Sequence, residues 1–96
     1  MRRFVFIRPR AEEDMQAASS WYENRLAGLG ERFAVELNRA MGDLETDADR
    51  FPIYYLNFRR ALLRRFPYKI FYQIEGDRVI VFRVLHASRD HRATAL

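Results

Sequence analysis

The segment YKIFYQIEGDRVIVFRVLH, residues 68–86, carries the strongest structural signal in this sequence. Its two runs, Tyr68–Glu75 and Arg78–His86, are rich in the β-branched and aromatic residues that strands favour. Between them lies Gly76-Asp77, a dipeptide typical of a tight hairpin turn. The segment therefore predicts an antiparallel β-hairpin.

The register of this hairpin depends on the length of its turn. A two-residue turn pairs Ile74 with Val79 and places Arg83 on the face that packs against the helices. A three-residue turn pairs Ile74 with Ile80 and places Arg83 beside Lys69 on the other face. We favour the three-residue turn because it avoids burying Arg83, although a slip of one residue reverses every side chain.

Two more β-rich runs, Ile53–Phe58 and Ala61–Phe66, precede the hairpin and extend it to an antiparallel meander. Near the N-terminus, Phe4–Ile7 is a short run of β formers bounded by Arg-Pro-Arg, which predicts one further strand. The segment between these strands, residues 8–52, has a different periodicity.

Residues 11–26 predict a helix, because apolar residues recur three or four positions apart. A second helix follows the turn at 27–30 and ends before Phe51-Pro52, since the residue preceding a proline is pushed out of helical geometry. The two apolar stripes are Met15, Ala18, Tyr22 and Leu26, and Phe33, Leu37, Ala40, Met41 and Leu44. The expected fold class is α+β: an N-terminal strand, an antiparallel helical hairpin, then an antiparallel β meander whose one face the helices cover.

Length and composition narrow the class of protein. The chain has 96 residues, which predicts a single domain over 1–96, and its hydrophobic fraction of 49% is that of a globular protein. Cysteine is absent, which excludes disulfides and thiol catalysis and fits a reducing cytoplasm. No apolar run is long enough for a transmembrane helix or a secretory signal, so no membrane association is expected.

The basic residues are unevenly distributed. All but one of the 17 are arginine, Lys69 being the exception. Residues 1–10 carry a net charge of +4, residues 11–49 of −7 and residues 50–96 of +7. This split predicts an acidic helical surface and a basic sheet surface on one domain.

The basic half, Tyr54–Arg92, interleaves arginines with aromatic residues and allows two interpretations. Arginine can bind phosphate and aromatic rings can stack on bases, which would indicate a nucleic-acid surface. Alternatively the aromatics fill the core and the arginine stems cover its rim. Trp21 is similarly ambiguous, since it lies off the first apolar stripe and could anchor a partner or close the edge of the core. No phosphate loop, dinucleotide fingerprint, zinc motif or nucleophile elbow occurs, so neither a cofactor nor a metal is expected.

Three words of the sequence, LGERF (29–33), LLRRFPYKIFY (62–72) and VLHASRD (84–90), resemble those of the RelE/ParE toxin superfamily. The closest resemblance is to its ParE branch, often labelled plasmid stabilisation proteins, and it covers essentially the whole chain. It implies the same α+β fold and a cytoplasmic bacterial toxin of a type II toxin–antitoxin system. It also implies a cognate ParD-like antitoxin, whose disordered C-terminal segment folds on binding and which alone contacts operator DNA.

The superfamily divides by target. RelE-like members cut messenger RNA on the ribosome, whereas ParE-like members poison DNA gyrase and cause growth arrest without being nucleases. Lys69 and Arg89 fall where RelE-like members carry functional basic residues, but their C-terminal tyrosine is replaced here by the tail 93–96. General acid–base catalysis on a ribose 2′-hydroxyl would then depend on His86, since arginine stays protonated. We therefore expect a gyrase poison with no catalytic residues; the alternative is an mRNA endonuclease that uses Lys69, His86 and Arg89.

Two sets of binding residues follow from this interpretation. The residues expected to contact the target are Arg59, Arg64, Arg65, Lys69, Arg83, Arg89 and Arg92. The residues expected to contact the antitoxin are Trp21, Arg25, Arg32 and Arg39.

Overall fold

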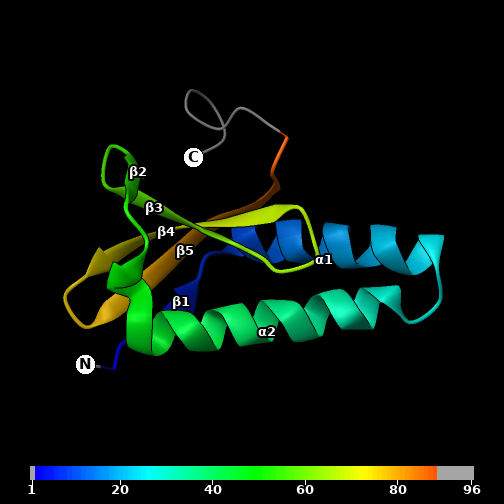
Figure 1. The fold of residues 1–96 in the computed structure, drawn as a ribbon, viewed down its shortest axis with the longest axis horizontal. Coiled ribbons are helices and arrows are strands. Elements are labelled where there is room, and N and C mark those ends of the chain that lie inside the picture. Colours follow the sequence, from blue (N-terminus) through cyan, green and yellow to red (C-terminus); the bar gives the residue numbers. More distant parts are fainter. Residues whose placement is uncertain (1, 89–96) are drawn as a thin grey trace.

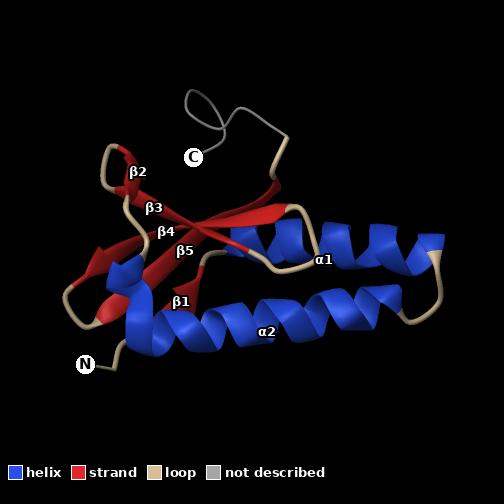
Figure 2. Ribbon diagram, in the orientation of Figure 1, coloured by secondary structure: helices blue, strands red, loops and turns tan. Residues whose placement is uncertain are grey.

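The computed structural model describes residues 2–88 and shows a five-stranded sheet with two helices packed on one face (Figure 1, Figure 2). The strand order is β1-β5-β4-β3-β2, with β1 parallel to β5 and the other neighbours antiparallel. The elements are β1 Phe4–Ile7, α1 Pro9–Arg25, α2 Leu29–Asp47, η1 Ala48–Arg50, β2 Ile53–Tyr55, β3 Phe58–Leu62, β4 Tyr68–Glu75 and β5 Arg78–His86. The predicted α+β fold is confirmed, and within residues 2–88 no helix is long and apolar enough to cross a membrane.

The strands β1, β4 and β5 have the bounds predicted from the sequence, whereas β2 ends three residues early and β3 is displaced, since it begins at Phe58 and ends at Leu62. The bounds differ because of two turns whose positive-φ positions hold Leu56 and Arg65 rather than the glycine or asparagine that would have indicated them in the sequence. Leu56 and Arg65 both adopt positive φ angles, of 54° and 69°, which no strand residue can hold. A tight turn therefore replaces the end of each predicted run.

The favoured three-residue hairpin turn is wrong. Ile74 pairs with Val79, so the turn contains only Gly76 and Asp77. A β-bulge further along β5 then adds one unpaired residue, Phe82, and shifts the register. Beyond the bulge Arg83 lies opposite Phe71, which is the register that the three-residue turn predicts for this end of the hairpin.

Arg83 also has a different environment from the one expected. It is only 8% exposed, and its guanidinium group forms a bidentate ion pair with Asp14 of α1. Arg83 is therefore buried against α1, contrary to the expectation, and the Asp14 carboxylate neutralises its charge. A bulge commonly re-aims a side chain in this way.

The main core lies between the helices and the inner face of the sheet, and Tyr72 is its largest fully buried side chain. The Tyr72 hydroxyl donates a 2.7 Å hydrogen bond to the carbonyl oxygen of Ala48 in η1. Burial raises the pKa of Tyr72 to about 12. The phenol therefore remains protonated in the folded protein at pH values where an exposed tyrosine ionises.

Replacing Tyr72 with phenylalanine is expected to cost about 1–2 kcal/mol at neutral pH, because the Ala48 carbonyl loses its partner. Above pH 10 the unfolded phenol ionises while the folded one does not, so wild-type stability should fall between pH 10 and 12. Urea unfolding across that range should show a shallower fall for Y72F. Tyr55→Phe is the control, and an equal slope in Y72F and wild type would contradict the assignment.

The two helices form the predicted hairpin, and the turn between them lies beyond the ends of the strands (Figure 1). Gly28 adopts a φ of 89°, a conformation that favours glycine. The Glu23 carboxylate of α1 accepts hydrogen bonds from the backbone N–H groups of Gly28 and Gly30, at 2.9 and 3.0 Å. A side chain of one helix therefore caps the N-terminus of the other and fixes the hairpin.

Candidate partner-binding groove

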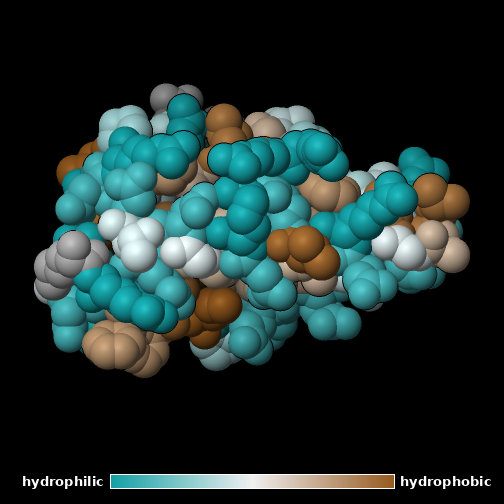
Figure 3. Space-filling model, turned by 60° about the horizontal axis from the view of Figure 1, so that its bottom comes forward, coloured by the Kyte–Doolittle hydropathy of each residue, from teal (hydrophilic) through white to brown (hydrophobic). Residues whose placement is uncertain are grey.

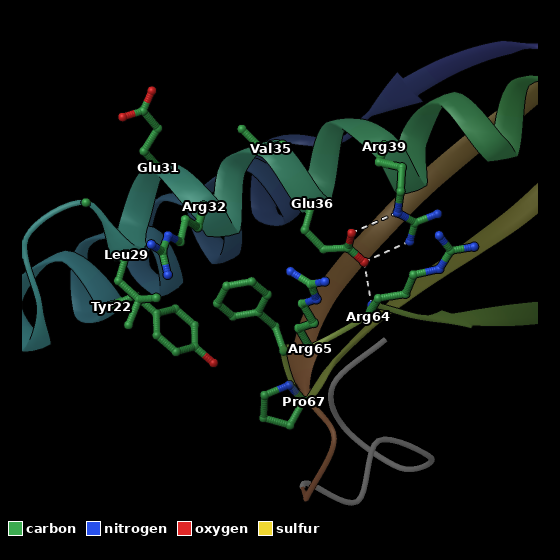
Figure 4. Close-up of a pocket in the computed structure, with 12 residues that line it drawn as sticks. Tyr22, Leu29, Glu31, Arg32, Val35, Glu36, Arg39, Arg64, Arg65 and Pro67 are labelled. Atoms are coloured by element: carbon green, nitrogen blue, oxygen red, sulfur yellow. Dashed lines mark hydrogen bonds and ion pairs between the residues drawn. The ribbon is translucent and has the colours of Figure 1, made fainter.

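A groove of about 1050 Å³ lies between α2 and the turn that joins β3 to β4, residues 63–67 (Figure 4). It brings together parts of the chain that are more than twenty residues apart in sequence. Its lining residues are Tyr22, Gly28, Leu29, Glu31, Arg32, Val35, Glu36, Arg39, Arg64, Arg65, Phe66 and Pro67.

The apolar part of the groove rests on an aromatic cluster. The rings of Tyr22 and Phe33 lie 5.0 and 5.2 Å from that of Phe66, both edge-to-face. Phe33 is fully buried, so the cluster continues into the core, whereas Val35 on α2 is 63% exposed. Apolar side chains also gather at the end of the molecule where α1 and α2 meet (Figure 3), and Leu26 there is 61% exposed.

The polar part of the groove is organised by Glu36. Its carboxylate accepts hydrogen bonds from Arg39 Nε at 2.8 Å and Nη2 at 2.7 Å (Figure 4). It also accepts one from the backbone N–H of Arg64, across the groove. These hydrogen bonds, first those from Arg39, lower the pKa of Glu36 below its usual value. Glu36 is therefore ionised and links α2 to the β3–β4 turn.

The β3–β4 turn has a tightly determined backbone. The Leu63 N–H donates to the Tyr68 carbonyl at 3.0 Å, and the Tyr68 N–H donates to the Phe66 carbonyl at 2.8 Å. Arg65 adopts its positive φ between them. The turn presents the exposed side chains of Arg64 and Arg65 at the groove, and that of Arg65 extends towards α2 (Figure 4).

The residues expected to bind an antitoxin lie on the helical hairpin. Arg32 and Arg39 line the groove. Trp21 and Arg25 lie together on α1, with the guanidinium carbon of Arg25 4.5 Å from the centre of the Trp21 indole ring. Trp21 is 52% exposed, which leaves much of its ring open to a partner.

The residues expected to contact the target do not share one surface. Arg64 and Arg65 belong to the groove. Arg59 donates hydrogen bonds to the carbonyl oxygens of Asp49 and Phe51, and Arg83 is held by Asp14. Arg83 is buried in that ion pair, where a target cannot reach most of it. Lys69 lies on β4, and the other two residues of the set, Arg89 and Arg92, lie outside the described residues.

Of the possible nucleolytic residues, the two that the structure describes, Lys69 and His86, are not brought together either. Lys69 pairs with Leu85 across the hairpin, on the face that carries the Phe71 side chain. His86 follows Leu85 and so points to the opposite face, where its ring lies 5.3 Å from that of Tyr68. Arg89 is outside the described residues. Burial, and then the charge of Arg60, lowers the pKa of Lys69.

Glu36 is the groove residue that sequence reasoning missed. On the sequence it is one acid of an ordinary i,i+3 pair with Arg39, a common feature of exposed helices. Its contact with Arg64 spans 28 residues and depends on how α2 packs against the sheet. Only the LLRRFP word, which places two arginines before a proline at a strand end, pointed to the other half of the groove.

Comparison with solved structures shows the same architecture in two toxin–antitoxin systems. The chromosomal ParDE system from Pseudomonas aeruginosa superposes with a TM-score of 0.80 at 14% identity, covering 90% of this chain and 97% of that one. The RelBE2 complex from Mycobacterium tuberculosis superposes with a TM-score of 0.64 at 22% identity, covering 90% and 99%. At these identities the likeness shows the fold alone. No curated protein matched the sequence.

Membership of a family is decided by the sequence itself. The family model described as the ParE toxin of the type II toxin–antitoxin system parDE matches residues 5–91. That range includes both helices, the strands β2 to β5, all of β1 except Phe4, and every residue of the groove. The chain therefore belongs to the ParE toxin family of type II toxin–antitoxin systems.

Proposed function

We propose that this ParE-family toxin arrests bacterial growth by binding DNA gyrase, and that a ParD-like antitoxin neutralises it in the cytoplasm. The family match over residues 5–91 carries this proposal. The positions of the candidate nuclease residues support a binding role rather than a cutting one. Lys69 and His86 lie on opposite faces of the sheet, an arrangement that does not favour joint action on one ribose.

The gyrase proposal is tested with purified gyrase and relaxed plasmid DNA. Increasing toxin should reduce supercoiling and increase the amount of cleaved DNA that remains bound to the enzyme. The same toxin premixed with its antitoxin is the control and should have no effect. Unchanged supercoiling with no trapped cleavage at saturating toxin would reject gyrase as the target.

One observation favours a second candidate, a ribosome-dependent mRNA endonuclease. Burial, and then the charge of Arg60, lowers the pKa of Lys69, as a residue that exchanges protons would require. The fold is also similar to that of the RelBE2 complex. Primer extension on messenger RNA from induced cells would then show cuts at codons in the ribosomal A site, and Lys69→Ala would abolish them. Growth arrest without such cuts would dismiss this candidate.

The antitoxin is proposed to contact the helical hairpin through Trp21, Arg25, Arg32 and Arg39. Trp21→Ala should weaken antitoxin binding about 10- to 30-fold, because exposed tryptophans in interfaces commonly anchor them. Isothermal titration calorimetry measures the change. Leu62→Ala is the control, since Leu62 is similarly exposed at 61% but lies on β3. Equal affinities for W21A and wild type would show that the antitoxin binds elsewhere.

A further inference from the structure

The outer face of the sheet, which is the face opposite the helices, carries a set of cations. Along β4, Ile70 and Tyr72 point to the core beneath the helices, whereas Phe71 belongs to a separate cluster on the other face. Both helices lie on the core side of the sheet (Figure 2). Within residues 2–88 the outer face is therefore free of any helix.

Arg60 of β3 is one of the cations on the outer face. It lies opposite Phe71, and its guanidinium carbon is 3.8 Å from the centre of the Tyr54 ring. Lys69 is two residues before Phe71 on β4 and so has the same face. Burial, and then the charge of Arg60, lowers the pKa of Lys69. These two cations therefore lie close enough to repel each other.

Arg8 reaches the same face from the end of β1. Its guanidinium carbon lies 4.9 Å from the centre of the Phe82 ring. Phe82 packs edge-to-face on Phe58, with the ring centres 5.0 Å apart, and Phe58 precedes Arg60 by two residues on β3. The residue that the bulge leaves unpaired thus supplies the ring beneath Arg8. Arg8 and Arg60 therefore belong to one surface.

We propose that this outer face binds the phosphate backbone of a nucleic acid, with Arg8 and Arg60 donating to phosphate oxygens and Lys69 beside them. For a toxin that acts on gyrase, the nucleic acid is the DNA that the enzyme holds. The source of the phosphate therefore rests on the proposed function, whereas the chemistry of the surface does not.

Charge is the first argument. Among residues 2–88 the side chains of Arg8, Arg60 and Lys69 form no ion pair or hydrogen bond. Glu75 is the single acidic residue in the five strands, and it pairs with Arg78 at 3.2 Å. Three cations thus share a surface on which no carboxylate neutralises them. A bound anion would relieve the repulsion between Arg60 and Lys69.

The rings beneath the two arginines are the second argument. A guanidinium group that lies over a ring keeps its N–H donors at its edge, where they can bind two phosphate oxygens in parallel. Because the arginines lie over Tyr54 and Phe82, these rings are poorly placed to anchor a protein. The outermost groups at both positions are therefore charged, which is typical of contacts to a phosphate backbone.

The spacing of the two arginines also suits a nucleic-acid strand. The supporting rings of Phe82 and Tyr54 lie on β5 and β2, three strand spacings apart, which is roughly 14 Å. Phosphates follow one another about every 3.4 Å along the axis on each strand of a DNA duplex. One backbone segment of about four steps can therefore contact both arginines.

Charge removal on the outer face tests the proposal with the full-length toxin and a fluorescein-labelled DNA duplex of about 20 base pairs. The variant R8Q/R60Q keeps part of each side-chain stem over its ring but removes both charges. Its DNA affinity, measured by fluorescence anisotropy, should fall about 20-fold at about 100 mM salt. The slope of log Kd against log salt should decrease by almost 2, since each phosphate contact contributes about 0.9. Unchanged affinity and slope would overturn the proposal.

Two further variants control this experiment. R32Q/R65Q removes two arginines that are also exposed but line the groove, and it should change DNA affinity less than 3-fold. An equal loss in both double variants would show attraction to the basic chain as a whole, which would reject the outer-face site. R8K/R60K keeps the charges and should keep the wild-type salt slope, so the test remains decisive if R8Q/R60Q fails to fold. A slope reduced in R8K/R60K would count against the proposal.

Competing RNA decides the source of the phosphate. The DNA duplex should bind at least as tightly as a single-stranded RNA of the same length. Tighter binding of RNA, lost in R8Q/R60Q, would support the phosphate-binding surface but reject DNA held by gyrase as its ligand.

The remaining outcomes separate this inference from the proposed function. If wild type inhibits supercoiling but binds no DNA, the inference fails and the gyrase proposal stands. If Arg8 and Arg60 are needed for DNA binding but supercoiling is unchanged, the gyrase proposal fails and the inference stands. If R8Q/R60Q loses affinity for gyrase in the absence of DNA, the outer face docks on an acidic protein surface, and the inference is overturned.

Discussion

Replacing Asp14 with alanine is expected to lower the free energy of unfolding by about 3–5 kcal/mol, the cost of removing one partner of a buried ion pair. Asp14 Oδ2 accepts a 2.7 Å hydrogen bond from Arg83 Nε, and Oδ1 accepts one of 2.9 Å from Nη2. The Val84 N–H donates a third, of 3.0 Å, to Oδ2. One carboxylate thus satisfies a buried charge and a backbone donor on a strand 69 residues away.

The size of this effect follows from burial. The side chains of Arg83 and Asp14 are only 9% and 14% exposed, so water replaces the lost carboxylate poorly. A natural domain is stable by about 5–15 kcal/mol, so D14A should be close to unfolding at room temperature. Denaturation in urea, followed by circular dichroism, would measure the loss.

Two further variants keep this prediction testable if D14A is too unstable to purify. The double variant D14A/R83M should recover much of the loss, because a buried ion pair can often be replaced by apolar groups at little cost. The control is Glu75→Ala, which breaks an exposed pair with Arg78 and should cost under about 1 kcal/mol. Equal stability of D14A and wild type would show that the ion pair contributes nothing.

The sequence predicted the elements of this fold well because each has a strong local pattern. The strands β4 and β5 were located by their β formers around Gly76-Asp77, and the helices by their apolar stripes. The bulge at Phe82 has no such pattern. It is stabilised by contacts between distant residues, among them the contact of Phe82 with Phe58 of β3, so no local rule could place it.

The sequence indicated the residues on each side of the groove but not that the two sides lie together. The sequence singled out Arg32 and Arg39 on the helices, and Arg64 and Arg65 before the proline, as candidate binding residues. It could not show that they meet, because their proximity depends on the packing of α2 beside the β3–β4 turn. The uneven distribution of charge along the chain therefore does not separate cleanly into an acidic helical surface and a basic sheet surface. Basic residues from the acidic helical segment and from the basic sheet segment line the same groove.

The second large effect is expected at the close approach of the two helices. A Cβ atom at Gly30 would lie 2.6 Å from the backbone carbonyl oxygen of Ser19 and 3.0 Å from the Glu23 side chain. A carbonyl on a helix cannot move away without displacing α1. Gly30→Ala should therefore lower stability by about 2–3 kcal/mol, at the upper end of the range for overpacked sites.

The effect should extend to function, because Glu23 caps both Gly28 and Gly30 and thereby sets where α2 begins. A shift of α2 relative to α1 moves Arg32, which lies two residues after Gly30 and lines the groove. We expect G30A to bind the antitoxin less tightly than wild type even at temperatures where both are folded. Gly42→Ala is the matched control on the same helix. Nothing lies within 4 Å of a Cβ there, so G42A should gain about 0.5–1 kcal/mol from helix propensity alone. If both alanine variants were stabilised alike, the close approach at Gly30 would not constrain the hairpin.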